Sequence, residues 1–475
     1  MMQNYEYLVS KTQNFHFSNT LLLHGLYLHW NNLEVYHNKN ITDEIVLIGD
    51  IFSSENPNLS LDEIAEKLLK IDHSIKDFIA EIDNLAGRFL VIYIKSDGMY
   101  VFTDATASIP VVYSKEFESI ASNPVVIKNM FNLKDSVDAK KILKFSSRNA
   151  LPYDLSIVEG VKYCLPNHYL DAINFKVFRY PTSPITEIDI DSAVEISHKL
   201  IKNIIESITT KYEICLPLTA GMDSRVLLSY LPRDTIAFTY KHRWMNMNHQ
   251  DIRIPRLITK TTNNKYEIFE TKSLSEDLKF EYKNAMGMMF SESAAQNAYT
   301  YSQTFLASRI FLSPNIIPFV KSKFGKKLPE VFAGYRFLNT RTYNYSNLNK
   351  KYIKEWHKAA KSYSKMNNLS LYDLFYWEVR YSKWVVNGLI NYDYLTKSID
   401  FCNCRKLILT WLAIPRKVRF TQSFHSKLLL LNNPSLLDFD FNPDDKRKFF
   451  LKNSALYYLI CWAHYIINKT KYLFK

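Results

Sequence analysis

The sequence is poor in glycine and in cysteine. Only 10 of its 475 residues are glycine, although phosphate-binding loops usually use several, because glycine lets the backbone turn tightly. The five cysteines are Cys164, Cys215, Cys402, Cys404 and Cys461. Their number is odd, and the Cys402–Cys404 spacing lacks the two-residue gap of common zinc sites. We therefore expect neither a disulfide framework nor a structural zinc site.

Long apolar runs are also absent. No stretch reaches the roughly 18 apolar residues needed to cross a bilayer, and the first residues, "MMQNYEYLVS", lack the basic and apolar segments of a signal peptide. We therefore expect a cytoplasmic protein. The apolar stretch 455–467 suits either a peripheral membrane contact or a packed terminal helix. Its 13 residues favour the packed helix.

What the sequence has is a surplus of positive charge. Sixty basic residues against 47 acidic ones give a net charge of +13, which suits an anionic partner such as a nucleotide, a sugar acid, a nucleic acid or a membrane surface. The richness in Lys, Ile and Asn is equally consistent with an AT-rich genome. Lys and Arg are spread along the chain rather than clustered in a recognisable motif, so we expect no nucleic-acid partner.

The length predicts two domains, and the first part of the chain is rich in strand patterns. Asp97-Gly98 is a strong hairpin signal. A helix is expected at 60–71, and a linker at 179–192 is indicated by its two prolines. The expected strands are 44–50, 87–94, 99–105 and 109–114.

After the linker, strands and helices alternate. Apolar residues between 191 and 209 recur at about 3.6 residues, which predicts an amphipathic helix. The expected elements that follow are a strand at 212–218, a turn at 219–224, a helix at 225–231, a strand at 235–240 and a helix at 250–260. This alternation favours a parallel sheet covered by helices. Beyond about residue 280 the pattern is mostly helical, including 371–390.

The turn lies in the stretch "LPLTAGMDSRVLL", residues 216–228. In a strand–turn–helix unit the turn amides and the helix N-terminus face the same way, which suits phosphate. Gly221 keeps the loop narrow, and the hydroxyls of Thr219 and Ser224 can donate hydrogen bonds. Asp223 repels phosphate unless a Mg²⁺ ion bridges the two. The alternative is an ordinary helix start that Asp223 and Ser224 cap.

The segment "LTAGMDS" (218–224) resembles the "SGGxDS" pyrophosphate loop of the asparagine synthetase family, whose members adenylate a carboxylate with ATP and then form an amide. Thr219 and Ala220 replace the first two residues, whereas Gly221, Asp223 and Ser224 match. The resemblance implies an ATP site made of Leu218, Thr219, Ala220, Gly221, Met222, Asp223, Ser224, Phe238 and Tyr240. It also implies Mg²⁺ ligation by Asp223 and Asp251.

The first part of the chain agrees with this resemblance. Residues 84–114, 121–124 and 161–171 look like the glutaminase-type domain at the front of these enzymes. The fold implied is an α+β, Ntn-hydrolase-like layered β-sandwich at 1–182, followed at 190–475 by an α/β ATP-pyrophosphatase domain with a parallel sheet and a helical C-terminal region. The family's N-terminal cysteine nucleophile is missing, since the sequence begins Met1-Met2. We therefore expect this domain to be inactive as a glutaminase.

The family's second phosphate segment has two candidates. Residues 324–337 match it at Glu330, Phe332, Gly334 and Tyr335, but Pro329 replaces the metal-binding aspartate. The alternative is 311–318. Lys326 and Lys327 could supply positive charge to the phosphates in place of the missing acid. Glu330 and Tyr335 are our candidates for orienting the amine or removing its proton, and Asp223 is the third candidate catalytic residue.

The resemblance implies an amide-forming ligase that uses ATP and Mg²⁺. The expected partners are a small carboxylate substrate, such as a uronic acid of surface-polysaccharide biosynthesis, and ammonia or an amine. The alternative is a catalytically degenerate relative that binds nucleotide or acts as a scaffold. Glu378 and Arg380 suit either substrate contacts or a structural pair, and the same holds for Asn403 and Arg405; in each case we expect the structural role.

Overall fold

The computed structural model describes residues 5–14, 16–71, 74–144, 146, 149–322, 324, 328–342, 344, 346–419 and 423–443, with positions 456, 459, 460, 462, 463, 466, 467 and 470. Lys326, Lys327, Cys461 and much of 455–467 lie outside the described residues. The four described cysteines are buried and free. In the part of the chain described, no helix is long and apolar enough to cross a membrane.

Two six-stranded antiparallel sheets form the front of the chain. The first has the order β10-β8-β9-β1-β3-β2 and consists of β1 (Glu6–Ser10), β2 (Asn19–Leu23), β3 (Leu26–Asn31), β8 (Val111–Ser114), β9 (Ser119–Ala121) and β10 (Lys162–Cys164). The second has the order β12-β11-β7-β6-β5-β4 and consists of β4 (Val35–Lys39), β5 (Glu44–Ser53), β6 (Leu85–Lys95), β7 (Gly98–Thr103), β11 (His168–Asp171) and β12 (Lys176–Arg179). Lys95 pairs with Gly98 at the predicted β6–β7 hairpin.

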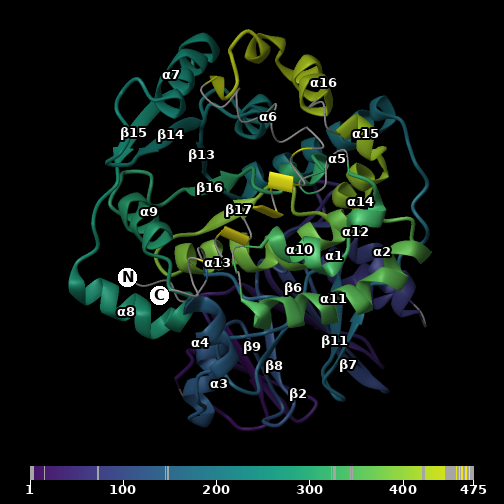
Figure 1. Ribbon diagram of the computed structural model, residues 1–475. Coiled ribbons are helices and arrows are strands. Elements are labelled where there is room, and N and C mark those ends of the chain that lie inside the picture. The colour runs from purple at the N-terminus through teal and green to yellow at the C-terminus, as the bar shows by residue number, and fades with distance from the viewer. Residues whose placement is uncertain are drawn as a thin grey trace.

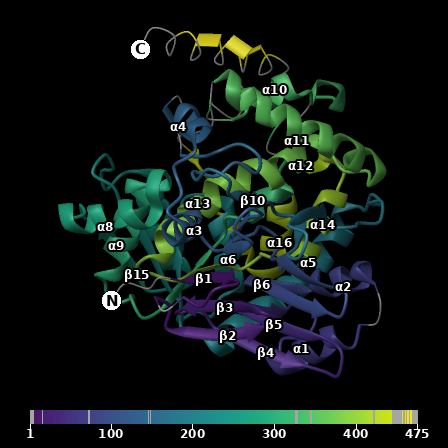
Figure 2. The same cartoon turned by 90° about the horizontal axis from the view of Figure 1, so that it is seen from below.

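The two sheets pack face to face between outer helices. Strand alternation sends Val46 and Ile48 of β5 into the core between the sheets, whereas Ile45 and Leu47 point outward. The helices α1 (Leu61–Leu69) and α2 (Ile75–Ile82) cover that outward face, beside β5 and β6 in Figure 2. On the first sheet, Leu8 points outward under α3 (Pro124–Phe131) and α4 (Val137–Lys144). The front is therefore a layered sandwich.

A five-stranded parallel sheet forms the centre of the second part (Figure 1). Its order is β15-β14-β13-β16-β17, with β13 (Ile214–Pro217), β14 (Ile236–Lys241), β15 (Tyr266–Glu270), β16 (Ile310–Ser313) and β17 (Ser398–Asp400). One face packs on α5 (Ile190–Lys211), α6 (Met222–Tyr230), α7 (Gln250–Thr262), α14 (Arg405–Ala413) and α16 (Ser423–Asn432). The other packs on α9 (Glu292–Ser302) and α13 (Ser382–Asp393).

The remaining described elements are helical. They are α8 (Glu276–Met286), α10 (Tyr335–Thr340), α11 (Asn347–Met366), α12 (Leu371–Leu374), α15 (Arg416–Arg419), the π-helical segment Phe375–Tyr381, and short 3₁₀ turns at Gly287–Met289, Ile317–Val320, Glu330–Phe332 and Pro434–Leu437. The helical pattern expected at 371–390 is therefore confirmed, with a π-helical middle.

The prediction of antiparallel strands in front, a parallel sheet behind and additional helices is confirmed. Residues 180–189, inside the expected linker, carry no regular secondary structure. Two boundaries differ from the prediction: β5 continues past the expected end at residue 50 to Ser53, and the turn expected at 219–224 is shorter, because α6 already begins at Met222. Gly221 takes an extended N-cap conformation, and Asp223 lies in the first turn, where the helix dipole favours an acid.

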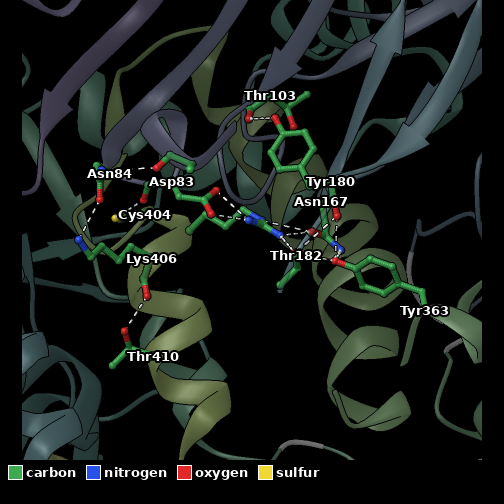
Figure 3. A network of polar contacts seen from close by, with 12 residues as sticks. Asp83, Asn84, Thr103, Asn167, Tyr180, Thr182, Tyr363, Cys404, Lys406 and Thr410 are labelled. Atoms are coloured by element: carbon green, nitrogen blue, oxygen red, sulfur yellow. Dashed lines mark hydrogen bonds and ion pairs between the residues drawn. The ribbon is translucent and has the colours of Figure 1, made fainter. Parts of the chain in front are cut away.

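Buried ion pairs join the two parts of the chain. We call three of them the seam: Arg88–Asp393 (2.7 Å), Arg179–Glu378 (2.8 Å) and Arg405–Asp83 (2.6 Å). The Arg405 guanidinium also donates to the side chains of Asn167 and Thr182, which lie near Asp83 and Tyr363 in Figure 3. The expectation that Glu378 and Arg405 have structural roles is confirmed.

Candidate functional site

The predicted phosphate loop follows β13, a central strand of the parallel sheet, at its carboxyl end. It is tied to the neighbouring strand, since the Leu218 amide donates to the Phe238 carbonyl (2.8 Å) and the Thr239 hydroxyl donates to the Leu218 carbonyl (2.7 Å). The Phe238 ring is buried, and the Tyr240 ring packs against it in a T-shaped arrangement, with ring centroids 5.3 Å apart. The loop thus bonds to the backbone carbonyl of Phe238, a residue of the ATP site that the resemblance implies.

Three loop amides donate hydrogen bonds to side chains of the protein. The Thr219 amide donates to the Ser224 hydroxyl (3.2 Å), and the Gly221 amide donates to the Thr219 hydroxyl (3.2 Å). The Ala220 amide donates to the Asp251 carboxylate (2.9 Å). The first turn of α6 differs, because its N-cap, Gly221, has no side chain that could accept from it. An anion would therefore meet the first turn of α6 rather than the loop.

Gly221 contributes space rather than conformational freedom. Its φ of −77° is open to any residue. A Cβ atom there would lie 3.4 Å from the Thr219 hydroxyl and 3.9 Å from the Asn442 side chain. The glycine therefore keeps the approach to the helix start clear.

Asp223 is held by two residues distant in sequence. Its carboxylate accepts from the Lys321 ammonium (2.7 Å) and from Nε2 of His425 (2.8 Å). Burial alone would raise the pKa of Asp223, but Lys321 and His425 hold it well below its usual range. Burial, followed by the charge of Lys321, lowers the pKa of His425. The cluster at neutral pH therefore combines a carboxylate, an ammonium and a neutral imidazole.

Neither Lys321 nor His425 was predicted from the sequence. Lys321 directly follows the turn Ile317–Val320, which comes after β16, and His425 lies in α16. Because β16 pairs in parallel with β13, the loops after these two strands share one edge of the sheet. The candidate segment 311–318 therefore begins at this edge of the sheet, and Lys321 lies between it and the other candidate, 324–337.

The magnesium site implied by Asp223 and Asp251 lacks further ligands. Among the described residues no three His, Cys, Asp or Glu side chains are grouped so that they could hold a metal ion. One carboxylate carries the Lys321 ammonium, and the other accepts the Ala220 amide. This donor set does not fit a resident Mg²⁺ ion. The positive charge at this position is instead that of Lys321.

The chain near residue 440 closes one side of the loop. Arg225 is fully buried, and its guanidinium donates to the carbonyls of Ala220 (3.0 Å), Leu436 (3.2 Å) and Phe439 (2.6 Å). The Asn442 amide also donates to the Ala220 carbonyl (3.3 Å). The Ala220 carbonyl of the loop therefore already has two donors from the protein, Arg225 and the Asn442 amide.

Glu330 makes its described contacts away from this cluster. Its carboxylate accepts from the Ser370 hydroxyl (2.6 Å) and the Leu371 amide (3.1 Å), and it pairs with Arg416 (2.6 Å), so it caps α12. Tyr335 begins α10 and packs edge-on against His357, with ring centroids 6.2 Å apart. The structure joins neither residue to Asp223 by a described contact, so their catalytic roles stay predictions.

No protein family and no curated protein matches the sequence. Among solved structures, the chain is similar to glutamine phosphoribosylpyrophosphate amidotransferase from B. subtilis complexed with ADP and GMP, at 13% identity and a TM-score of 0.19. That match covers 52% of this chain and 52% of the other, about half of each. A structure of the allosteric regulatory enzyme of purine biosynthesis matches at 10% identity and a TM-score of 0.24, covering 68% and 70%. Similarities this weak assign neither fold nor function.

Proposed function

We propose that this protein is an ATP-dependent amide-forming ligase. It would activate a substrate carboxylate as an acyl-adenylate and transfer the acyl group to ammonia or an amine. One observation carries the proposal: α6 starts without a side-chain cap at the carboxyl edge of the parallel sheet, beside the ammonium of Lys321. The layered front and the parallel sheet also suit the Ntn-hydrolase-like and ATP-pyrophosphatase folds that the sequence resemblance implies.

The chain's own groups supply the electrostatics of the first step. The first-turn amides of α6 and the Lys321 ammonium bind the β- and γ-phosphates, because both present positive charge to them. An oxygen of the substrate carboxylate attacks the α-phosphorus, and the bond to the bridging oxygen of pyrophosphate breaks. Negative charge grows on the departing pyrophosphate, which these donors stabilise.

Asp223 and His425 position the lysine. The carboxylate holds the Lys321 ammonium at 2.7 Å, and the His425 ring fixes the carboxylate from the other side. In the second step the amine attacks the acyl carbon and AMP leaves. A uronic acid or another sugar-linked acid is our proposed acceptor.

ATP–pyrophosphate exchange with a panel of uronic acids and aspartate tests the proposal, run once with Mg²⁺ and once with EDTA. We expect exchange that falls at least about a hundredfold in Lys321→Met, since two or three charge-assisted contacts are lost. Lys321→Arg should retain part of it. Lys260→Met, which removes an exposed lysine of α7, is the matched control and should exchange like the wild type.

Two results would contradict the proposal. Exchange that persists in Lys321→Met or in Asp223→Ala would place the chemistry elsewhere. Absence of exchange together with absence of ATP binding by calorimetry would favour the alternative, a degenerate protein that serves as a scaffold.

A further inference from the structure

A separate cavity opens where the front sandwich meets α13. Its walls come from β1, β5 and β6 on one side and from α13 and the residues just after it on the other. Apolar side chains, including Leu33, Ile109 and Ile390, make part of the lining, and Tyr5 and Tyr394 contribute aromatic rings. Four carboxylates also face it: Glu6, Glu34, Asp50 and Asp393.

Three of these carboxylates have cationic partners. The Asp393 carboxylate accepts hydrogen bonds from both terminal nitrogens of Arg88, each at 2.7 Å. Asp50 pairs with Lys397 at 2.8 Å. Glu34 pairs with Lys211 and accepts from the Tyr212 hydroxyl at 3.0 Å. The negative charges of these three carboxylates are therefore balanced by positive charges of the protein.

Glu6 is the exception. No described residue donates a hydrogen bond to its carboxylate or forms an ion pair with it. Burial raises the pKa of the Tyr394 hydroxyl, and the nearby charges of Glu281 and Glu6 act in the same direction. Burial raises the pKa of Glu6 itself, because the carboxylate loses water and gains no cation in return. The four carboxylates therefore have three cationic partners, of which Arg88 and Lys397 line the cavity and Lys211 lies outside its lining, and Glu6 has no such partner among the described residues.

We propose that this cavity binds the ammonium group of an aliphatic amine, with Glu6 as its counter-ion. Keeping a carboxylate charged in partly apolar surroundings costs free energy unless a cation pairs with it. An ammonium supplies that charge and donates up to three hydrogen bonds. Tyr5 and Tyr394 also line the cavity, and aromatic rings attract cations. The apolar lining around this space of about 50 Å³ receives the carbons next to the ammonium. An alkyl carboxylate meets repulsion, and an alcohol leaves Glu6 without a counter-charge. This inference does not depend on the proposed ligase activity.

Calorimetric titration of the full chain with n-butylammonium, n-butanol and butyrate tests the site. We expect saturable ammonium binding at least about tenfold tighter than butanol binding, and no binding of butyrate. Glu6→Gln should weaken ammonium binding by about tenfold or more. Glu159→Gln removes an exposed carboxylate away from the cavity lining and should bind like the wild type. Equal binding of butanol, unchanged binding by Glu6→Gln, or no saturable ammonium binding would each overturn the proposal.

A second variant separates occupation of the cavity from a general charge effect. Ile390→Trp enlarges a lining side chain of α13 and leaves Glu6 in place. We expect it to lose ammonium binding while its thermal unfolding stays cooperative; tight binding in this variant would contradict the assigned location. Lys321→Met should bind butylammonium normally, so failure of the ligase proposal and failure of this one are distinguishable.

Discussion

The seam and the phosphate-loop region contain the same kinds of charged side chain but use them differently. In the seam, the six side chains are between 0% and 19% exposed. Asp223 and Lys321 beside the loop are each about a quarter exposed, at 26% and 25%. A buried ion pair is inaccessible to a ligand and contributes to stability only. A partly exposed pair at a helix start can also contact a bound ligand. We therefore expect substitutions in the seam to change stability and those near the loop to change binding.

The largest effect is expected at the centre of the seam, in Glu378→Gln. The Glu378 carboxylate accepts from Arg179, from the indole of Trp356 (2.8 Å) and from the Asn167 amide (3.1 Å). Removing its charge leaves Arg179 largely buried without a counter-ion, which costs about 3–5 kcal/mol. Urea unfolding measures this loss. The double variant with Arg179→Met should recover part of it, and a single-variant loss below about 1 kcal/mol would mean that the pair behaves like a surface ion pair.

His168 makes the seam sensitive to pH. It is buried, which lowers the pKa of its imidazole to about 4, although Glu378 acts in the opposite direction. The unfolded chain binds this proton near pH 6.5 and the folded chain only near pH 4. Stability should therefore fall as the pH drops through this window, by about 3 kcal/mol in total.

His168→Asn is the variant that isolates this contribution. It removes the titrating ring and keeps a side chain able to donate to the Pro166 carbonyl. Unfolding free energies between pH 7 and pH 4 should show a smaller slope than in the wild type. Identical slopes would assign the pH dependence to other groups.

Near the loop, Gly221→Asp is expected to change binding without changing stability. The new carboxylate would cap α6, which is worth only a few tenths of a kcal/mol relative to glycine. It would also place a negative charge where the phosphates are expected, so ATP affinity should fall about a hundredfold. Gly221→Ala adds only a Cβ atom, whose nearest neighbour would be the Thr219 hydroxyl oxygen at 3.4 Å, and this variant should keep most of the ATP affinity. Calorimetry that finds equal affinity in both variants would show that the helix start does not bind the nucleotide.

The features that could be predicted from the sequence depend on residues that are adjacent in the chain. Short apolar runs indicated β5 and β6, and Asp97-Gly98 marked the hairpin between β6 and β7. The strand–turn–helix around Gly221 was recognisable because its apolar runs and its turn residues are adjacent. Its exact boundary was not, since the capping role of Gly221 depends on backbone geometry.

The partners of Asp223 could not be predicted in this way. Lys321 is 98 positions away in the chain and His425 is 202. Only the pairing of β16 with β13 and the packing of α16 against α6 bring them together. Glu330 shows the converse: its place in a family-like motif suggested chemistry, but its carboxylate caps α12.

The smallest effect is expected for Lys383, which lies in α13 where this helix meets β10 of the front sandwich. Its side-chain nitrogen lies over the Tyr163 ring, 3.2 Å from the centroid, and has no hydrogen-bond partner among the described residues. Burial lowers the pKa of Lys383 well below its usual range, so at neutral pH this lysine opposes folding. Lys383→Met should stabilise the protein by about 2 kcal/mol at pH 7. That gain should shrink as the pH rises toward about 10.4, where the unfolded chain also loses the proton. Chemical denaturation at pH 7 and pH 9.5 measures both values, and a destabilised variant would show that the contact with Tyr163 outweighs the cost of burying the amine.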